Sequence, residues 1–329
     1  MEIDFAEIIT FRKYRAQRKR LLLPALENIM WALFGLASAL FLGIYDIFKK
    51  QSLNSNAVMP VLFFSTVASS LLFTPFIVIS FKSPELLANT GLYVPQLTAS
   101  EHLQVLLKSA IVVSSWVLAF FALKHLPITI VAPIRATGPL WTLIGALIIF
   151  HERLNVYQWI GIAITLVFFY LFSTAGKLEG INFKRNKWIY FIVAATLLGA
   201  CSGLYDKFIL RRIDRVAVQA WFSVYQVVIL LPFVLLNEKV RKRRNIHFEW
   251  RWTIPLIGLF LVIADYLYFY ALSNEDALIS VISALRRGSV LVAFVVGGVL
   301  FKEQNLKKKG AYLVGILTGI LLITLGTVL

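Results

Sequence analysis

Long apolar stretches alternate with short polar ones along almost the whole chain. Ten stretches of about 20–25 residues are predominantly apolar, which is the length that a helix needs to cross the hydrocarbon core of a bilayer. Their apolar residues are continuous, whereas the strands of a membrane barrel would alternate. The pattern therefore predicts an all-α integral membrane protein with ten transmembrane helices. The ten predicted spans are residues 30–50, 57–81, 104–123, 127–150, 155–175, 188–210, 216–236, 253–272, 277–301 and 310–328.

Two motifs occur twice along the chain. Residues 42–53 (LGIYDIFKKQSL) and 202–213 (SGLYDKFILRRI) share Gly, Tyr, Asp and Phe in register, which pairs Asp46 with Asp206. A second match aligns residues 133–154 with 284–305 at an offset of 151 and pairs Arg135 with Arg286. The chain therefore divides into two five-helix repeats, 30–175 and 188–329. Because five is odd, the repeats have opposite orientations in the membrane, and such inverted repeats are typical of secondary transporters.

The basic residues leave the orientation in the membrane open. Residues 1–29 form a basic N-terminal extension without an apolar core, which favours a cytoplasmic N-terminus. With the N-terminus inside, however, the outer loops hold seventeen Lys and Arg residues and the inner loops five. This distribution contradicts the positive-inside rule. One hypothesis removes the conflict: synthesis begins at Met30, and the N-terminus lies outside.

Composition excludes several classes of protein. The chain is 59% hydrophobic and has a formal net charge of +16, but its bases lie between apolar runs, so they indicate contact with anionic lipid rather than with nucleic acid. The single cysteine, Cys201, excludes an internal disulfide, and the four histidines are scattered. We find no nucleophile motif, metal-ligand spacing or phosphate-binding loop. We therefore expect no enzymatic activity, no metal and no cofactor.

The ends of the two repeats carry a more specific resemblance. Residues 122–162 and 271–316 contain recurring glycines and glutamates after their fourth and ninth spans. In this pattern the chain resembles an EamA-type carrier of the drug/metabolite transporter superfamily. The positions that match the family are Pro127, Pro133, Pro139, Glu152, Gly161, Glu303 and Gly310. The second repeat lacks the prolines and has Arg286 and Arg287 instead. The resemblance implies the ten-helix fold and transport of small metabolites, and leaves the substrate undetermined.

Arginines near the middle of two spans are the leading candidate binding residues. A charged side chain at the bilayer centre is costly unless it is paired or faces water. Arg135 and Arg286 therefore either bind an anion in a central cavity or serve as structural partners, with Asp265 as the natural partner. Thr142 and Ser289 share their helix faces by spacing. We predict a substrate site made of Arg135, Thr142, Trp116, Asp265, Tyr266, Arg286 and Ser289.

The duplicated aspartates have two interpretations. Asp46 and Asp206 could couple transport to protons or cations. Alternatively, each is a structural partner of a neighbouring base at helix spacing. Those bases are Lys49 and Lys50 for Asp46, and Lys207 and Arg211 for Asp206.

We therefore expect a secondary transporter of small metabolites, anionic or zwitterionic, that works by alternating access around a cavity between the two repeats. The alternative is a flippase for a lipid-linked intermediate. The expected partners are a small-molecule substrate and the lipid bilayer, and the expected location is the cytoplasmic (inner) cell membrane. Gly315 and Gly319 form a GxxxG motif that favours close helix packing, within the chain or across a homodimer. The sequence does not distinguish a monomer from a homodimer.

Overall fold

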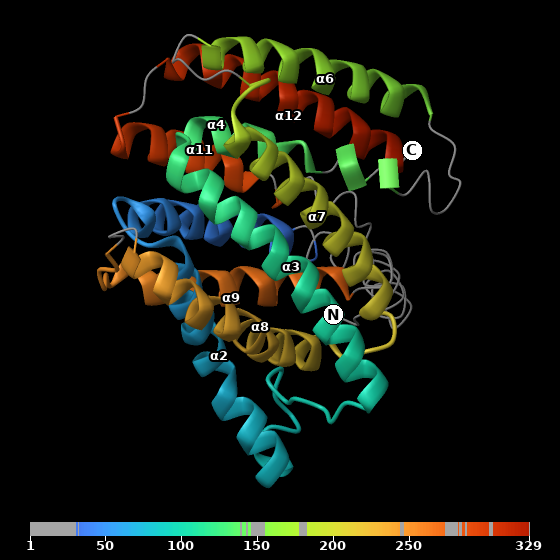
Figure 1. Ribbon diagram of the computed structural model, residues 1–329. Coiled ribbons are helices and arrows are strands. Elements are labelled where there is room, and N and C mark those ends of the chain that lie inside the picture. Colours follow the sequence, from blue (N-terminus) through green and yellow to red (C-terminus); the bar gives the residue numbers. More distant parts are fainter. Residues whose placement is uncertain are drawn as a thin grey trace, which may run out of the picture.

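Helices make up all the regular structure in the described part of the chain (Figure 1). The computed structural model describes residues 31, 33–138, 140–142, 144–145, 155–177, 183–243, 247–273, 282, 285–286, 288–302 and 305–328. The first helix covers residues 33–53. The elements after it are α2 (Val58–Lys82), η1 (Pro84–Leu86), α3 (Ala99–His125), α4 (Ile128–Ala136), α6 (Val156–Lys177), α7 (Lys187–Ile209), α8 (Arg215–Arg243), α9 (Thr253–Leu272), α11 (Gly288–Leu300) and α12 (Leu306–Val328).

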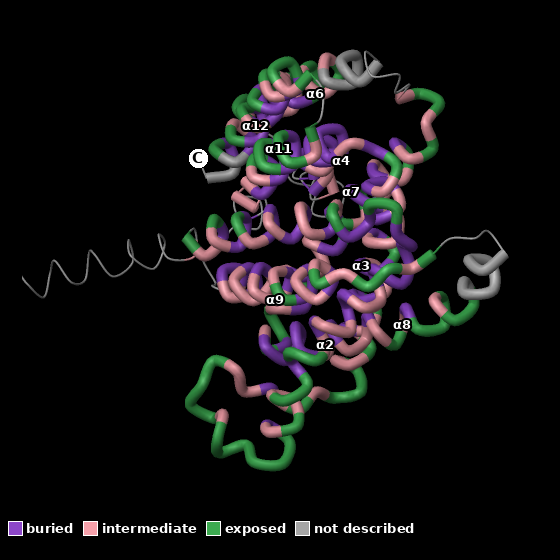
Figure 2. Tube along the Cα trace, turned by 90° about the vertical axis from the view of Figure 1, so that its left-hand side faces the viewer, coloured by how far each residue is buried: buried purple, intermediate pink, exposed green. Residues whose placement is uncertain are grey.

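The helices support the predicted membrane architecture. In the part of the chain that is described, five helices are long and apolar enough to cross a bilayer: α2, α3, α7, α8 as far as Leu236, and α9. Large apolar side chains such as Leu71, Phe81 and Trp159 are exposed. In Figure 2 exposed positions run along the outward sides of the helices, where lipid would cover them. An all-helical membrane protein is thus confirmed, while the full set of ten spanning helices stays a prediction.

Two helix boundaries differ from the predicted spans for local reasons. α3 begins at Ala99 rather than near residue 104, because Thr98 and Glu101 form a capping box that satisfies the first free N–H groups. α4 ends at Ala136, and a turn at Thr137 interrupts the predicted span 127–150. Pro133 lies before the turn and Pro139 follows it in the sequence. A proline lacks the backbone N–H that a continuous helix needs. This break begins two residues after Arg135, one of the predicted site residues.

Helices of the first repeat pack against helices of the second. α6 lies along α12, α4 along α11 and α2 along α8, and Figure 1 shows α6 and α12 side by side at one edge. Small residues bring α6 and α12 together: a Cβ built at Gly161 would lie 2.6 Å from the carbonyl oxygen of Gly319. The GxxxG motif therefore serves packing within the chain.

Two hydrogen bonds from serine side chains join the two repeats. Ser38 in the first helix donates to the carbonyl of Ala264 in α9 at 2.6 Å. Ser115 in α3 donates to the carbonyl of Ala195 in α7 at 2.7 Å. Both contacts link a helix of one repeat to a helix of the other.

The structure leaves several predicted features outside the described residues. These are the extension 1–29 and the residues Pro139, Glu152, Arg287 and Glu303.

Candidate functional site

A cavity of about 180 Å³ lies between the two repeats. Its walls come from the first helix, α3, the α4 region, α7, α8, α9 and Arg286. The described residues that line it include aromatic side chains from both repeats, among them Tyr45, Trp116, Phe222 and Tyr268. Its charged lining residues are Lys49, Lys108, Arg135, Asp206, Asp265 and Arg286.

The first charged cluster centres on Asp46. Arg135 Nη1 donates to both carboxylate oxygens of Asp46, at 2.7 and 2.9 Å. Lys49 Nζ donates to Oδ1 of the same carboxylate at 2.6 Å and lies 4.3 Å from the centre of the Tyr45 ring. The pairing of Asp46 with Lys49 at helix spacing is confirmed. Lys50 instead donates to the carbonyl oxygens at the end of α3.

The second charged cluster joins Arg286 to Asp265. Arg286 Nη2 donates to Asp265 Oδ1 at 2.8 Å, and the two side chains are 13% and 14% exposed. The guanidinium carbon of Arg286 also lies 4.0 Å from the centre of the Tyr268 ring. Within the described residues, the buried Nε of Arg286 has no hydrogen-bond partner. Asp265 is thus the partner of Arg286, while one donor of the guanidinium remains available to a ligand.

The third cluster connects the repeats directly. Lys108 Nζ in α3 donates to Asp206 Oδ1 in α7 at 2.5 Å. Tyr268 OH donates to Asp206 Oδ2 at 3.4 Å. Lys108 Nζ also lies over the rings of Phe222 and Phe269, at 4.3 and 5.0 Å. The described ion pair of Asp206 is therefore with α3, and not with the sequence neighbours that helix spacing indicated.

Most of the other predicted site residues lie in or beside the cavity. Trp116 and Thr142 line it, as do Arg135, Asp265 and Arg286. Ser289 lines a smaller adjoining cavity together with Asp46, Lys49 and Arg135. The nine predicted site and coupling residues therefore gather around one interior region, with one exception.

The exception is Tyr266, which is not among the described residues that line the cavity. Its hydroxyl donates to the carbonyl of Gly91 in the loop after α2, at 3.1 Å. Successive helical residues point about 100° apart, so Tyr266 faces away from the side that Asp265 occupies. Tyr268, three positions after Asp265, shares that side and lines the cavity in its place.

Comparison with known proteins identifies the family. The family model of the EamA-like transporter family matches residues 29–174 and 186–325, once for each repeat. The chain belongs to the EamA-like transporter family. This confirms the resemblance drawn from the ends of the two repeats.

Other comparisons of this EamA-like transporter give the fold alone. One solved structure, described as "Crystal structure of protein", matches with a TM-score of 0.61 at 13% sequence identity. The match covers 90% of this chain and 97% of that one. No curated protein matches the sequence.

Two charged residues of the EamA-like site were missed by the sequence-based prediction. Lys108 lies inside the predicted span 104–123, and the cost of a charge in the membrane could have singled it out as it did Arg135. Lys49 was considered only as a partner of Asp46, although it also lines the cavity. Among the described residues, no group of three or more His, Cys, Asp or Glu side chains could hold a metal ion.

Proposed function

We propose that this EamA-like protein is a secondary carrier of small anionic or zwitterionic metabolites in the cell membrane. The observation that supports this most strongly is the place of Arg135 and Arg286. They occupy matching positions in the two repeats, and both line one cavity together with Asp265. A guanidinium can hold a carboxylate or a phosphate through two hydrogen bonds, and a neighbouring carboxylate can receive an ammonium group.

The cost of the buried charges argues for a role beyond packing. Removing two charges from water costs several kcal/mol each, and their attraction returns this only when the geometry is good. Replacement of a buried ion pair by apolar residues of similar size is often neutral or stabilising for a fold. A cavity that keeps Lys49, Lys108, Arg135 and Arg286 with their carboxylates is therefore best explained by a charged substrate.

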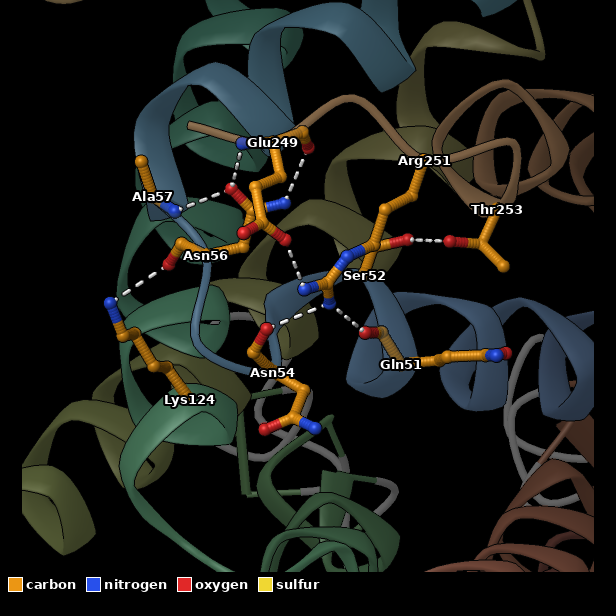
Figure 3. A network of polar contacts seen from close by, with 9 residues as sticks. All are labelled: Gln51, Ser52, Asn54, Asn56, Ala57, Lys124, Glu249, Arg251 and Thr253. Carbon is orange, nitrogen blue, oxygen red and sulfur yellow. Dashed lines mark hydrogen bonds and ion pairs between the residues drawn. The ribbon is translucent and has the colours of Figure 1, made fainter. Parts of the chain in front are cut away.

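Alternating access requires contacts between the repeats that can form and break. A polar network at the end of the first helix has this character (Figure 3). Asn56 and Glu249 exchange two hydrogen bonds, at 2.8 and 3.0 Å. Arg251 donates to the carbonyl oxygens of Gln51 and Asn54 at 2.9 and 2.7 Å. The network links the end of the first helix to the segment before α9, so its opening would separate the repeats at this end.

The proposal is tested by uptake into proteoliposomes. The purified protein would be given radiolabelled amino acids, monocarboxylates, sugar phosphates and nucleotide sugars, with empty liposomes as the control. Saturable uptake of at least one charged metabolite, lost in Arg286→Ala, is the expected result. Uptake of none, together with accelerated exchange of fluorescent lipids between leaflets, would replace the carrier by a flippase.

A further inference from the structure

The two duplicated arginines are held differently by the duplicated aspartates. In the first repeat, Arg135 donates to both carboxylate oxygens of Asp46, at 2.7 and 2.9 Å. In the second repeat, the matching Arg286 donates to Asp265 at 2.8 Å instead. Within the described residues, no hydrogen bond joins Arg286 to Asp206, the aspartate that matches Asp46. The second arginine is therefore separated from its duplicated aspartate.

A tyrosine connects the two groups that are separated. The guanidinium carbon of Arg286 lies 4.0 Å from the centre of the Tyr268 ring. The hydroxyl of the same tyrosine donates to Asp206 Oδ2 at 3.4 Å. Asp206 is held from its other oxygen by the ammonium group of Lys108. Tyr268 thus contacts the arginine with its ring and the aspartate with its hydroxyl.

Alignment of the repeats shows how this difference arises. The FFAL motif of the first repeat matches FYAL of the second, and the same register pairs Ala119 with Tyr268 and Trp116 with Asp265. All four residues line the cavity. Where the first repeat has only a methyl group, the second repeat has a phenol ring. Where the first repeat has an indole, the second has the carboxylate that Arg286 uses.

We propose that Tyr268 is a positioning residue of the substrate site, whose ring holds the guanidinium of Arg286 away from Asp206 and toward the negative group of the substrate. This inference rests on the carrier function proposed above. Asp265, one helical turn before Tyr268, accepts from Nη2, and the buried Nε has no partner within the described residues. An oxygen of a carboxylate or a phosphate would satisfy this donor.

Removal of the ring should let Arg286 pair with Asp206. Opposite charges attract strongly in an interior with little water. Asp46 accepts from Lys49 and Arg135 at once, so a carboxylate that is paired with a lysine can accept from an arginine as well. With an alanine at position 268, as at 119 in the first repeat, the guanidinium should turn to Asp206 and be less available to the substrate.

The test measures how uptake into proteoliposomes depends on substrate concentration. The probes are radiolabelled glutamate, lactate and ribose phosphate. Tyr268→Ala should raise KM about five- to tenfold, as the loss of a cation–π contact implies, with a maximal rate near that of the native protein. Tyr268→Phe keeps the aromatic face and should stay within about twofold of the native KM. Tyr268→Leu keeps most of the volume without an aromatic face, should also raise KM, and replaces the alanine variant if that variant does not fold.

Tyr270→Ala is the matched control. Tyr270 lies on the same helix, and its ring is 4.2 Å from the guanidinium carbon of Arg215. Neither residue is among the described residues that line the cavity. The variant therefore removes the same kind of contact outside the site and should keep the native KM. Melting temperatures in detergent show which variants have kept the fold.

Each outcome bears on one of the two proposals. A native KM in the alanine and leucine variants of Tyr268 would overturn the positioning role. A KM in Tyr268→Phe as high as in Tyr268→Ala would overturn it too, because the hydroxyl rather than the ring would then matter, and so would an equal rise in Tyr270→Ala. In these cases uptake by the native protein that is lost in Arg286→Ala leaves the carrier function standing. If the native protein takes up no charged metabolite, the carrier function fails and this inference fails with it.

Discussion

Lys108 on α3 and Asp206 on α7 meet at 2.5 Å across the boundary between the two repeats. Their side chains are 2% and 6% exposed, so neither charge has water to stabilise it if the other is removed. A contact between residues 98 positions apart in the chain thus fixes two helices of opposite repeats against each other.

Removal of one partner should be more harmful than removal of both. Lys108→Gln leaves Asp206 buried without its cation and should destabilise the protein by about 3–5 kcal/mol. The double variant Lys108→Gln with Asp206→Asn should recover most of this loss, because no charge is then left uncompensated. Melting temperatures in detergent measure both effects. A double variant no more stable than the single one would show that the pair is not the source of the stability.

Variants of the pair Arg286–Asp265 should distinguish an effect on substrate binding from an effect on folding. Arg286→Lys should keep the fold and lose most transport, since an ammonium group cannot reproduce the planar fork of a guanidinium. Arg286→Ala should lose transport and some expression as well. The measurements are uptake in proteoliposomes and the yield of folded protein.

The corresponding double variant tests the structural alternative for this pair. Arg286→Ala with Asp265→Ala should raise expression above either single variant, because it removes both buried charges. Transport should remain absent. Full transport in the double variant would show that the pair is structural and would end the role of Arg286 in substrate binding.

Close packing of α6 on α12 should not tolerate a larger residue. A methyl group at Gly319 would lie 2.8 Å from the carbonyl oxygen of Gly161 and against the side chain of Thr165. Gly319→Ala should therefore destabilise the protein by about 1–3 kcal/mol. Gly203→Ala is the control for stability, because nothing lies within 4 Å of the added methyl. Equal melting temperatures for both variants would contradict the packing shown in Figure 1.

The polar network at the end of the first helix should control access at that side. Arg251→Ala removes two hydrogen bonds to backbone carbonyls of the residues before α2. In a protein that contains Cys201→Ala and Ala57→Cys, this change should increase the rate of maleimide labelling several-fold, since Ala57 is only 2% exposed in the intact network. The same cysteine variant with Arg251 retained is the reference. Unchanged labelling would mean that Arg251 does not hold this end closed.

Sequence reasoning recovered the features that repeat or that follow helix geometry. The duplicated Asp46 and Asp206, and the duplicated Arg135 and Arg286, led to the interior site. The spacing of three residues between Asp46 and Lys49 correctly predicted their pairing.

Contacts between helices that are far apart in the sequence could not be predicted from local spacing. Local spacing gave Asp206 the wrong partner because Lys108 reaches it from another helix. Tyr266 was among the predicted site residues, whereas the rotation of the helix places Tyr268 on the cavity side.

The sharing of Asp46 between Lys49 and Arg135 has a mechanical consequence. Asp46 and Lys49 belong to the first helix and Arg135 belongs to α4, so one carboxylate holds these two helices of the first repeat together. The two helices should therefore move as one rigid unit when the repeats reorient.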